Sequence, residues 1–207
     1  MTGAEISFII VNDYSQNRSY IDETYYIDVP KRQNSIGDGN GLCWVACSLS
    51  LIDYIRLGMG NPALSYTTKG LYEYYRDNYY VPTPEYPYPV GIPSTILSLL
   101  NVFNVSINHS SSGLTFSNVA TFMVAEHPIL SGLWSSTWTG MHRAHLVVLC
   151  GSRRFSQTGA TIYYYYRLMD PNCSSNYVVI SVSNTGTNYT YNYGTTTYDT
   201  WLDTFYY

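Results

Sequence analysis

Charged residues are scarce in this chain. They make up 12% of its 207 residues, about half the usual share, with 10 Lys and Arg against 14 Asp and Glu. The resulting net charge of −4 excludes a strongly basic surface of the kind that binds nucleic acid or anionic membranes. No nucleic-acid partner is therefore expected.

Long apolar runs are missing as well. No stretch reaches the roughly 18 apolar residues that a membrane-spanning helix needs, so no span is expected. Residues 1–5 are not a basic segment followed by an apolar run, and no signal peptide is expected. The composition is nevertheless rich in Tyr, Asn, Ser and Thr and poor in Lys, which favours an extracellular bacterial protein, and the localisation stays open.

Cysteine is scarce as well. Cys43, Cys47, Cys150 and Cys173 are too few for a disulfide scaffold at this length. Cys43 and Cys47 have no second Cys/His pair at zinc-binding spacing, so neither a metal nor another cofactor is expected. A bridge between Cys150 and Cys173 stays open, because sequence alone does not show pairing.

The order of the expected elements predicts an α+β fold, since helices come first and strands follow. In residues 43–57, apolar side chains recur at helical spacing and indicate a helix with one buried face. Ser48 and Asp53 lie outside that face. Further helices are expected at about 68–79, 93–103 and 115–126, with a Pro-rich surface crossing at 81–89. Strands are expected at 6–11, 25–29, 105–107, 128–133, 144–150, 161–169 and 177–183.

Cys43 is the first candidate for chemistry. It follows a loop rich in Gly, Asn, Ser and Asp and begins the expected helix. The backbone N–H groups and the dipole of a helix N-terminus favour negative charge, so a thiolate is stabilised there. The alternative is a buried structural cysteine, the usual fate of a free Cys. Cys47 lies one turn further into the helix and is expected in the core.

His145 is the best candidate base among the four histidines. It begins an apolar strand, where an unpaired imidazole would be costly, although a hydrogen-bonded structural histidine is the alternative. Asp170 follows the strand at 161–169, and the Asp-Pro-Asn sequence that it begins is also a common turn opening. Adjacent antiparallel strands place the start of one beside the end of the other, which predicts that His145 and Asp170 are neighbours.

Three segments together resemble the bacterial papain-like cysteine peptidases. They are LCWVAC at 42–47, AHLVVLCG at 144–151 and MDPN at 169–172. Their order and spacing are similar to those of the family over roughly residues 25–183, and the bacteriocin-processing peptidases and the papain-like effector peptidases of plant-pathogenic bacteria are the groups most resembled. The resemblance implies peptides or proteins as substrates and a Cys-His-Asp triad, with Cys43 as nucleophile, His145 as base and acid, and Asp170 as the residue that orients the imidazole.

The resemblance also implies one papain-like domain over residues 1–207. A mainly helical lobe at about 25–127 would carry the catalytic cysteine at the start of a helix. This lobe would pack on an antiparallel sheet or barrel lobe at about 128–207. Residues 1–24 are expected to form an N-terminal arm or an extra strand.

The residue that binds the oxyanion departs from the family pattern. A Gln usually stands about six residues before the cysteine and donates its amide to the oxyanion, but this chain has Gly37 there. We expect Gln33 to take this role across an inserted loop, with Asn40 or Asn34 as alternatives. The backbone N–H of Cys43 would be the second donor.

Other uses of the same residues define the alternatives to a peptidase. The same site would serve an acyl transferase, a deamidase or a leader peptidase that cuts after paired glycines. A catalytically degenerate papain-like module would instead bind a partner through a Tyr-rich surface. Trp44, Trp134 and Trp138 are candidates for the walls of a cleft. Core packing is the alternative for Trp134 and Trp138, and for Trp44 it is compatible with that role.

Overall fold

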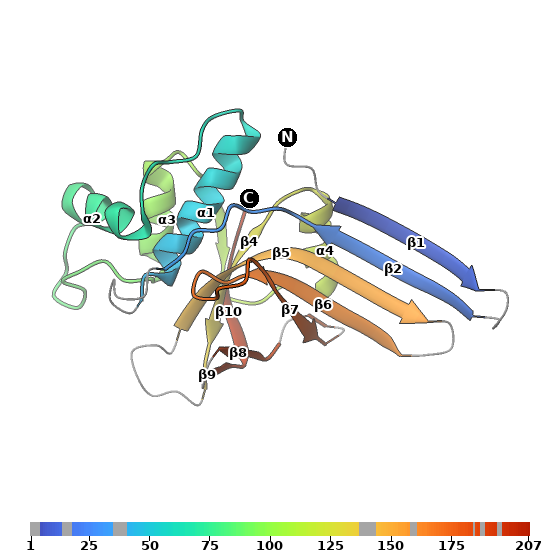
Figure 1. Cartoon of the computed structure of the whole chain (residues 1–207). Coiled ribbons are helices and arrows are strands. Elements are labelled where there is room, and N and C mark those ends of the chain that lie inside the picture. Colours follow the sequence, from blue (N-terminus) through green and yellow to red (C-terminus); the bar gives the residue numbers. More distant parts are fainter. Residues whose placement is uncertain are drawn as a thin grey trace.

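Helices and a mostly antiparallel sheet make up this protein, as seen in a computed structural model (Figure 1). The structure describes residues 5–13, 18–34, 41–136, 144–157, 161–183, 185–186, 189–193 and 196–207. The α+β class expected from the sequence is confirmed. Within the described ranges, no helix is both long and apolar enough to cross a membrane.

Four helices in the described part of the chain begin and end close to the residues expected from the sequence. They are α1 (Cys43–Gly58), α2 (Thr68–Asn78), α3 (Pro93–Val102) and α4 (Phe116–Val124). The hydroxyls of Thr67 and Thr115 cap α2 and α4, each accepting a hydrogen bond from a backbone N–H of the first turn. Pro93 suits the first turn of α3, where its missing N–H costs nothing.

The strands of the described residues form one large sheet and a separate hairpin. The large sheet contains β1 (Glu5–Asp13), β2 (Arg18–Tyr26), β3 (Asn108–Ser110), β4 (Ile129–Trp134), β5 (Ala144–Gln157), β6 (Ile162–Met169), β7 (Val178–Val182) and β10 (Thr200–Tyr206). The hairpin contains β8 (Tyr191–Tyr193) and β9 (Thr196–Tyr198). The long strand β5 lies at the centre, because β4 pairs with its first half, β2 with its second half and β6 with its other edge.

Three strand predictions differ from the structure. The strand expected at 25–29 begins earlier, as β2 at Arg18, the strand expected at 105–107 lies later as β3, and β5 continues past residue 150. Polar pairs between β2 and β5, such as Asp22 with Arg153 at 2.5 Å, stabilise the strands in this region. Because the residues there do not alternate between apolar and polar, the sequence pattern does not predict these strands. Residues 5–13 form strand β1, which pairs with β2 along its whole length.

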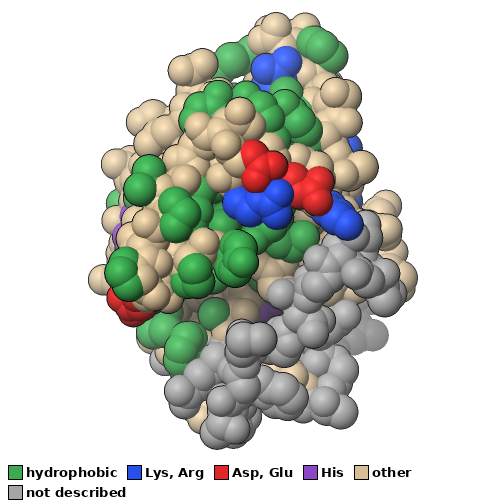
Figure 2. Space-filling view, turned by 90° about the vertical axis from the view of Figure 1, so that its left-hand side faces the viewer, with side chains coloured by type: hydrophobic (Ala, Val, Ile, Leu, Met, Phe, Trp, Pro, Cys, Tyr) green, Lys and Arg blue, Asp and Glu red, His purple; other side chains and the backbone are tan. Residues whose placement is uncertain are grey.

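Three of the helices and the extended strands of the sheet lie at opposite ends of the molecule (Figure 1). Helices α1, α2 and α3 gather at one end, and β1, β2, β5 and β6 extend past them at the other. The first turn of α1 and the first residues of β5 meet at the helical end. Seen from that side, apolar side chains surround a small central group of charges (Figure 2).

Helix α1 is buried on almost all sides, and the prediction of a single buried face is wrong. Ser48 and Asp53, which fall off the apolar stripe, are both fully buried. The Asp53 carboxylate accepts a hydrogen bond from Arg32 Nε at 2.6 Å and another from the Leu64 backbone N–H at 2.7 Å. Because a polar group is tolerated in the core when it is paired, apolar periodicity alone does not reveal the second buried face.

Arg32→Met is expected to destabilise the protein by about 3 kcal/mol, because it leaves the Asp53 carboxylate buried without its cation. Urea unfolding followed by circular dichroism measures this loss. Arg76→Met is the matched control, since Arg76 and Asp77 pair at the surface, where ion pairs contribute little. Equal losses in the two variants would contradict the role given to the buried pair.

Candidate active site

Three side chains converge at the end of the sheet where α1 begins. Cys43 is the first residue of α1, His145 lies at the start of β5, and Asp170 directly follows β6. Strands β5 and β6 are antiparallel neighbours with Val148 opposite Met169, so the start of β5 lies beside the end of β6. The predicted antiparallel pairing of these strands is confirmed, and His145 and Asp170 are in contact.

The Cys43 thiol is half-buried at the N-terminus of α1. Leu42 precedes the helix without a side-chain cap, and its carbonyl accepts the first intrahelical hydrogen bond from the Ala46 N–H at 3.0 Å. Burial opposes ionisation of the thiol, but a hydrogen bond and the positive charge of His145, with a hydrogen bond from the Leu146 backbone, hold the pKa of Cys43 below its ordinary value. The thiolate is therefore the favoured form beside a protonated His145.

The His145 imidazole bridges the thiol and the carboxylate. Only 4% of the residue is exposed, and its Nε2 lies 3.0 Å from Asp170 Oδ1. Burial opposes the charged form, but the hydrogen bonds to Asp170 and Cys43 raise the pKa of His145 to about 10. The lowered pKa of Cys43 and the raised pKa of His145 both favour a thiolate–imidazolium pair over the neutral thiol and imidazole.

The Asp170 carboxylate is fully buried and accepts hydrogen bonds on both oxygens. Oδ1 accepts from His145 Nε2 and from the Asn172 backbone N–H at 2.8 Å, and Oδ2 accepts from the Tyr191 hydroxyl. Burial alone would raise the pKa of Asp170, but the hydrogen bond and charge of His145, helped by Tyr191 and Asn172, lower it. A buried anion thus faces the imidazole, the arrangement that orients a catalytic base.

Two tyrosines that the sequence did not single out cover the pair of His145 and Asp170. Tyr191 on β8 and Tyr198 on β9 are cross-strand partners, and both are buried. The Tyr198 ring centroid lies 5.4 Å from that of His145, and the Tyr191 ring is parallel to the imidazole within 11° at 6.4 Å. No local pattern distinguishes these two among the 24 tyrosines, so only the folded chain identifies them.

The segment 32–34 ties three parts of the molecule together just before the described residues resume at Gly41. The Arg32 backbone N–H bonds to Ser50 on α1, and the Gln33 carbonyl accepts from Thr68 on α2. Asn34 reaches the turn after β6, where its N–H bonds to the Pro171 carbonyl at 3.0 Å and its side chain to Asn172 at 3.1 Å.

The three residues expected as oxyanion donors lie in different surroundings. The Gln33 side chain is exposed and, within the described residues, hydrogen-bonds to none of the three converging side chains. Asn40 lies outside the described residues. Asn34 is engaged with the Asp170 turn instead, through Asn172. Gln33 therefore stays a prediction for the oxyanion site.

The three tryptophans considered as cleft walls also differ in their surroundings. Trp44 is 2% exposed and packs edge-on against Tyr72 and Tyr75 of α2, so it belongs to the core, and its role as a cleft wall stays a prediction. Trp134 is half-buried at the end of β4, opposite Ala144 at the start of β5. Trp138 lies outside the described residues.

The remaining cysteines differ from Cys43 in their surroundings. The Cys47 thiol is fully buried and donates to the Leu146 carbonyl at 3.1 Å, and burial raises its pKa well above the ordinary value. Burial also raises the pKa of Cys150 to about 12, and it raises the pKa of Cys173. All four thiols are free, so Cys150 and Cys173 are not bridged in this structure.

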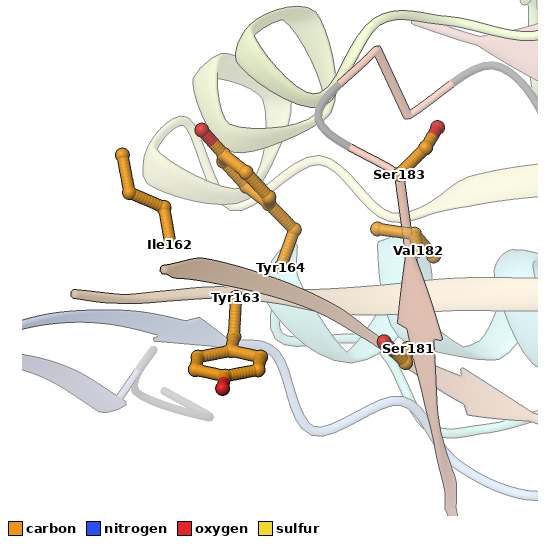
Figure 3. Close-up of a pocket in the computed structure, with 6 residues that line it drawn as sticks. All are labelled: Ile162, Tyr163, Tyr164, Ser181, Val182 and Ser183. Carbon is orange, nitrogen blue, oxygen red and sulfur yellow. The ribbon is translucent and has the colours of Figure 1, made fainter. Parts of the chain in front are cut away.

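A shallow depression elsewhere on the sheet carries none of this chemistry. Its volume is about 460 Å³, and it lies where β6 begins and β7 ends (Figure 3). Strands rise about 3.3 Å per residue, which places it roughly 20 Å from Asp170. It is lined by Ile162, Tyr163, Tyr164, Ser181, Val182 and Ser183. Elsewhere in the described residues, no cluster of His, Cys, Asp or Glu is arranged to hold a metal ion.

Comparisons with known proteins do not add to this picture. No protein-family model matches the chain, and no curated protein matches it in sequence. The function is therefore inferred from the geometry of the site and from the resemblance of the three motifs.

Proposed function

We propose that this chain is a papain-like cysteine peptidase that hydrolyses peptide bonds in peptides or proteins. The observation that carries the proposal is the chain of contacts from Cys43 at the start of α1 through His145 to the buried Asp170. The placement of the thiol on a helix, and of its two partners on antiparallel strands, supports a papain-like arrangement.

The proposed reaction proceeds through a thioester. The Cys43 thiolate attacks the carbonyl carbon of the peptide bond, and the carbonyl oxygen takes up the negative charge. The His145 imidazolium then gives its proton to the amine that leaves as the carbon–nitrogen bond breaks. Neutral His145 next takes a proton from the water that attacks the thioester, which releases the carboxylic acid and restores the thiolate and imidazolium.

The oxyanion is proposed to lie at the N-terminus of α1. There the backbone N–H of Cys43 is one donor, and the positive end of the helix dipole favours the developing charge. The Gln33 amide is proposed as the second donor. Its segment is anchored to α1 and α2, while its side chain is exposed and makes no hydrogen bond to the other residues that the structure describes.

Gln33→Ala is expected to lower kcat by about 10²–10³ with little change in KM, because it removes one of two oxyanion donors. Steady-state kinetics on a fluorogenic peptide, selected from a library, measure the two constants. Asn40→Ala is the matched variant. A loss of this size at Asn40, with Gln33→Ala close to the parent protein, would contradict the assignment to Gln33.

The proposal is tested by labelling the intact protein with an epoxysuccinyl inhibitor and mapping the label by mass spectrometry. We expect modification of Cys43 alone, since the three other thiols have raised pKa values and two of them are fully buried. A protein that leaves Cys43 unmodified would contradict the peptidase proposal.

Product analysis separates hydrolysis from other uses of the same site. Incubation with a peptide library should give shorter peptides with new free termini. Intact peptides with an altered side-chain amide would instead indicate a deamidase, and joined peptides a transferase.

A further inference from the structure

The second oxygen of the Asp170 carboxylate has a partner that the proposed reaction has not used. Oδ1 serves His145 and the Asn172 N–H, while Oδ2 accepts from the Tyr191 hydroxyl. We propose that Tyr191 is a positioning residue, which keeps the Asp170 carboxylate ionised and turned toward His145. This inference rests on the proposed function, because it gives the same site a fourth member.

Tyr191 fixes the rotation of the carboxylate. A carboxylate bonded through one oxygen can still turn about its Cβ–Cγ bond, whereas donors on both oxygens hold one orientation. The Tyr191 side chain is itself confined, since the residue is 2% exposed, pairs with Tyr198 across the hairpin and lies parallel to the imidazole. The hydroxyl therefore reaches Asp170 from a rigid support.

The titratable groups that face Asp170 make Tyr191 the suitable donor. Within the described residues these groups are His145, Cys43, Cys47, Cys173 and Tyr191 itself. The Cys173 sulfur lies 3.6 Å from Oδ2, but a thiol is a weak hydrogen-bond donor. Burial and the charge of Asp170 raise the pKa of Tyr191, so its hydroxyl keeps the proton that it donates.

The two hairpin tyrosines also keep water from the pair. Their rings lie beside the imidazole, with centroids 6.4 Å and 5.4 Å from it, and each residue is no more than 5% exposed. Charge interactions are stronger where water is excluded, which strengthens the attraction between the His145 imidazolium and the Asp170 carboxylate. The hydroxyl of Tyr191 and its ring thus act on the same two groups.

Tyr191→Phe removes the hydroxyl and keeps the ring. Tyr189→Phe is the matched control, because Tyr189 is equally buried two residues away and its hydroxyl bonds to Ser131 at 2.9 Å instead of to Asp170. The titration of Asp170 is followed by nuclear magnetic resonance of its carboxyl ¹³C, assigned by its absence in Asp170→Asn. Turnover of the fluorogenic peptide is measured on the same proteins.

We expect the Asp170 titration midpoint to rise by about one pH unit in Tyr191→Phe, the usual worth of one hydrogen bond to a charged group, and to stay unchanged in Tyr189→Phe. We expect kcat to fall about tenfold with KM unchanged, since Tyr191 is buried behind Asp170. Coinciding titrations of parent and Tyr191→Phe would overturn the inference. If Tyr191→Phe does not fold, 3,5-difluorotyrosine is placed at position 191, because it is a stronger hydrogen-bond donor of similar shape. It should lower the Asp170 titration midpoint, and an unchanged midpoint would equally overturn the inference.

Failure of this inference and failure of the proposed function are distinguishable. The Asp170 titration needs no turnover, so it reports on Tyr191 alone. Absence of any reactivity at Cys43 in the parent protein would instead count against the peptidase.

Discussion

Cys43→Ala is expected to abolish peptide hydrolysis, with kcat lowered by about 10⁴-fold or more. The sulfur is the atom that would form the thioester, and no other thiol of the chain can replace it. Cys47 is fully buried and bonded to a backbone carbonyl, and its pKa is raised where that of Cys43 is lowered. Residual turnover should not exceed what substrate binding and the oxyanion donors supply.

The control for this variant is Cys150→Ala. Cys150 is a fully buried thiol on β5, and it donates to the Arg167 carbonyl rather than to any member of the site. Both variants lose one sulfur atom. A loss of activity in both would therefore indicate that the substitutions impair folding, and thermal unfolding of each variant checks this. Cys43→Ala protein that hydrolyses the peptide at the parent rate would rule out Cys43 as the nucleophile.

Asp170→Asn is expected to lower kcat by about 10⁴-fold. An amide presents only one acceptor oxygen to the donors of His145, Asn172 and Tyr191, so its N–H₂ group must face one of them. The imidazolium also loses its anion, so the pKa of His145 falls from about 10 and the alkaline limit of activity moves to lower pH. A pH profile of kcat on the fluorogenic peptide measures both effects.

The chain offers a matched control for this variant in a second pair of His and Asp. His109 Nε2 lies 2.7 Å from Asp203 Oδ1, between β3 and β10, and both side chains are partly exposed. Asp203→Asn should leave kcat and its alkaline limit unchanged. An Asp170→Asn protein with kcat within tenfold of the parent would contradict the orienting role of Asp170.

The parts of the site that could be predicted from sequence depend on short-range patterns. Cys43 was found because a polar, Gly-rich loop passes into a run with helical period, which defines a helix start. His145 and Asp170 were joined by a general property of antiparallel strands, and β5 and β6 do pair as that argument required.

The parts that could not be predicted depend on contacts between distant segments. Tyr191 bonds to Asp170 from a hairpin in a Tyr- and Thr-rich region without clear periodicity. Apolar periodicity leaves Asp53 off the buried face of α1, because its partner Arg32 stands before the helix and not on it. The sequence predicts the start of β2 too late, because the first residues of this strand are polar and are paired by β1 and β5.

The pH dependence of Cys43 alkylation shows whether His145 activates the Cys43 thiol. Iodoacetamide reacts with the thiolate, so the rate at Cys43, mapped by mass spectrometry between pH 4 and pH 10 or so, follows its ionisation. We predict a midpoint below the value of about 8.5 for a free cysteine, because His145 stabilises the thiolate, and a return to that value or above in His145→Ala. A midpoint in the parent protein at or above that of a free cysteine, unmoved by His145→Ala, would rule out activation of Cys43 by His145.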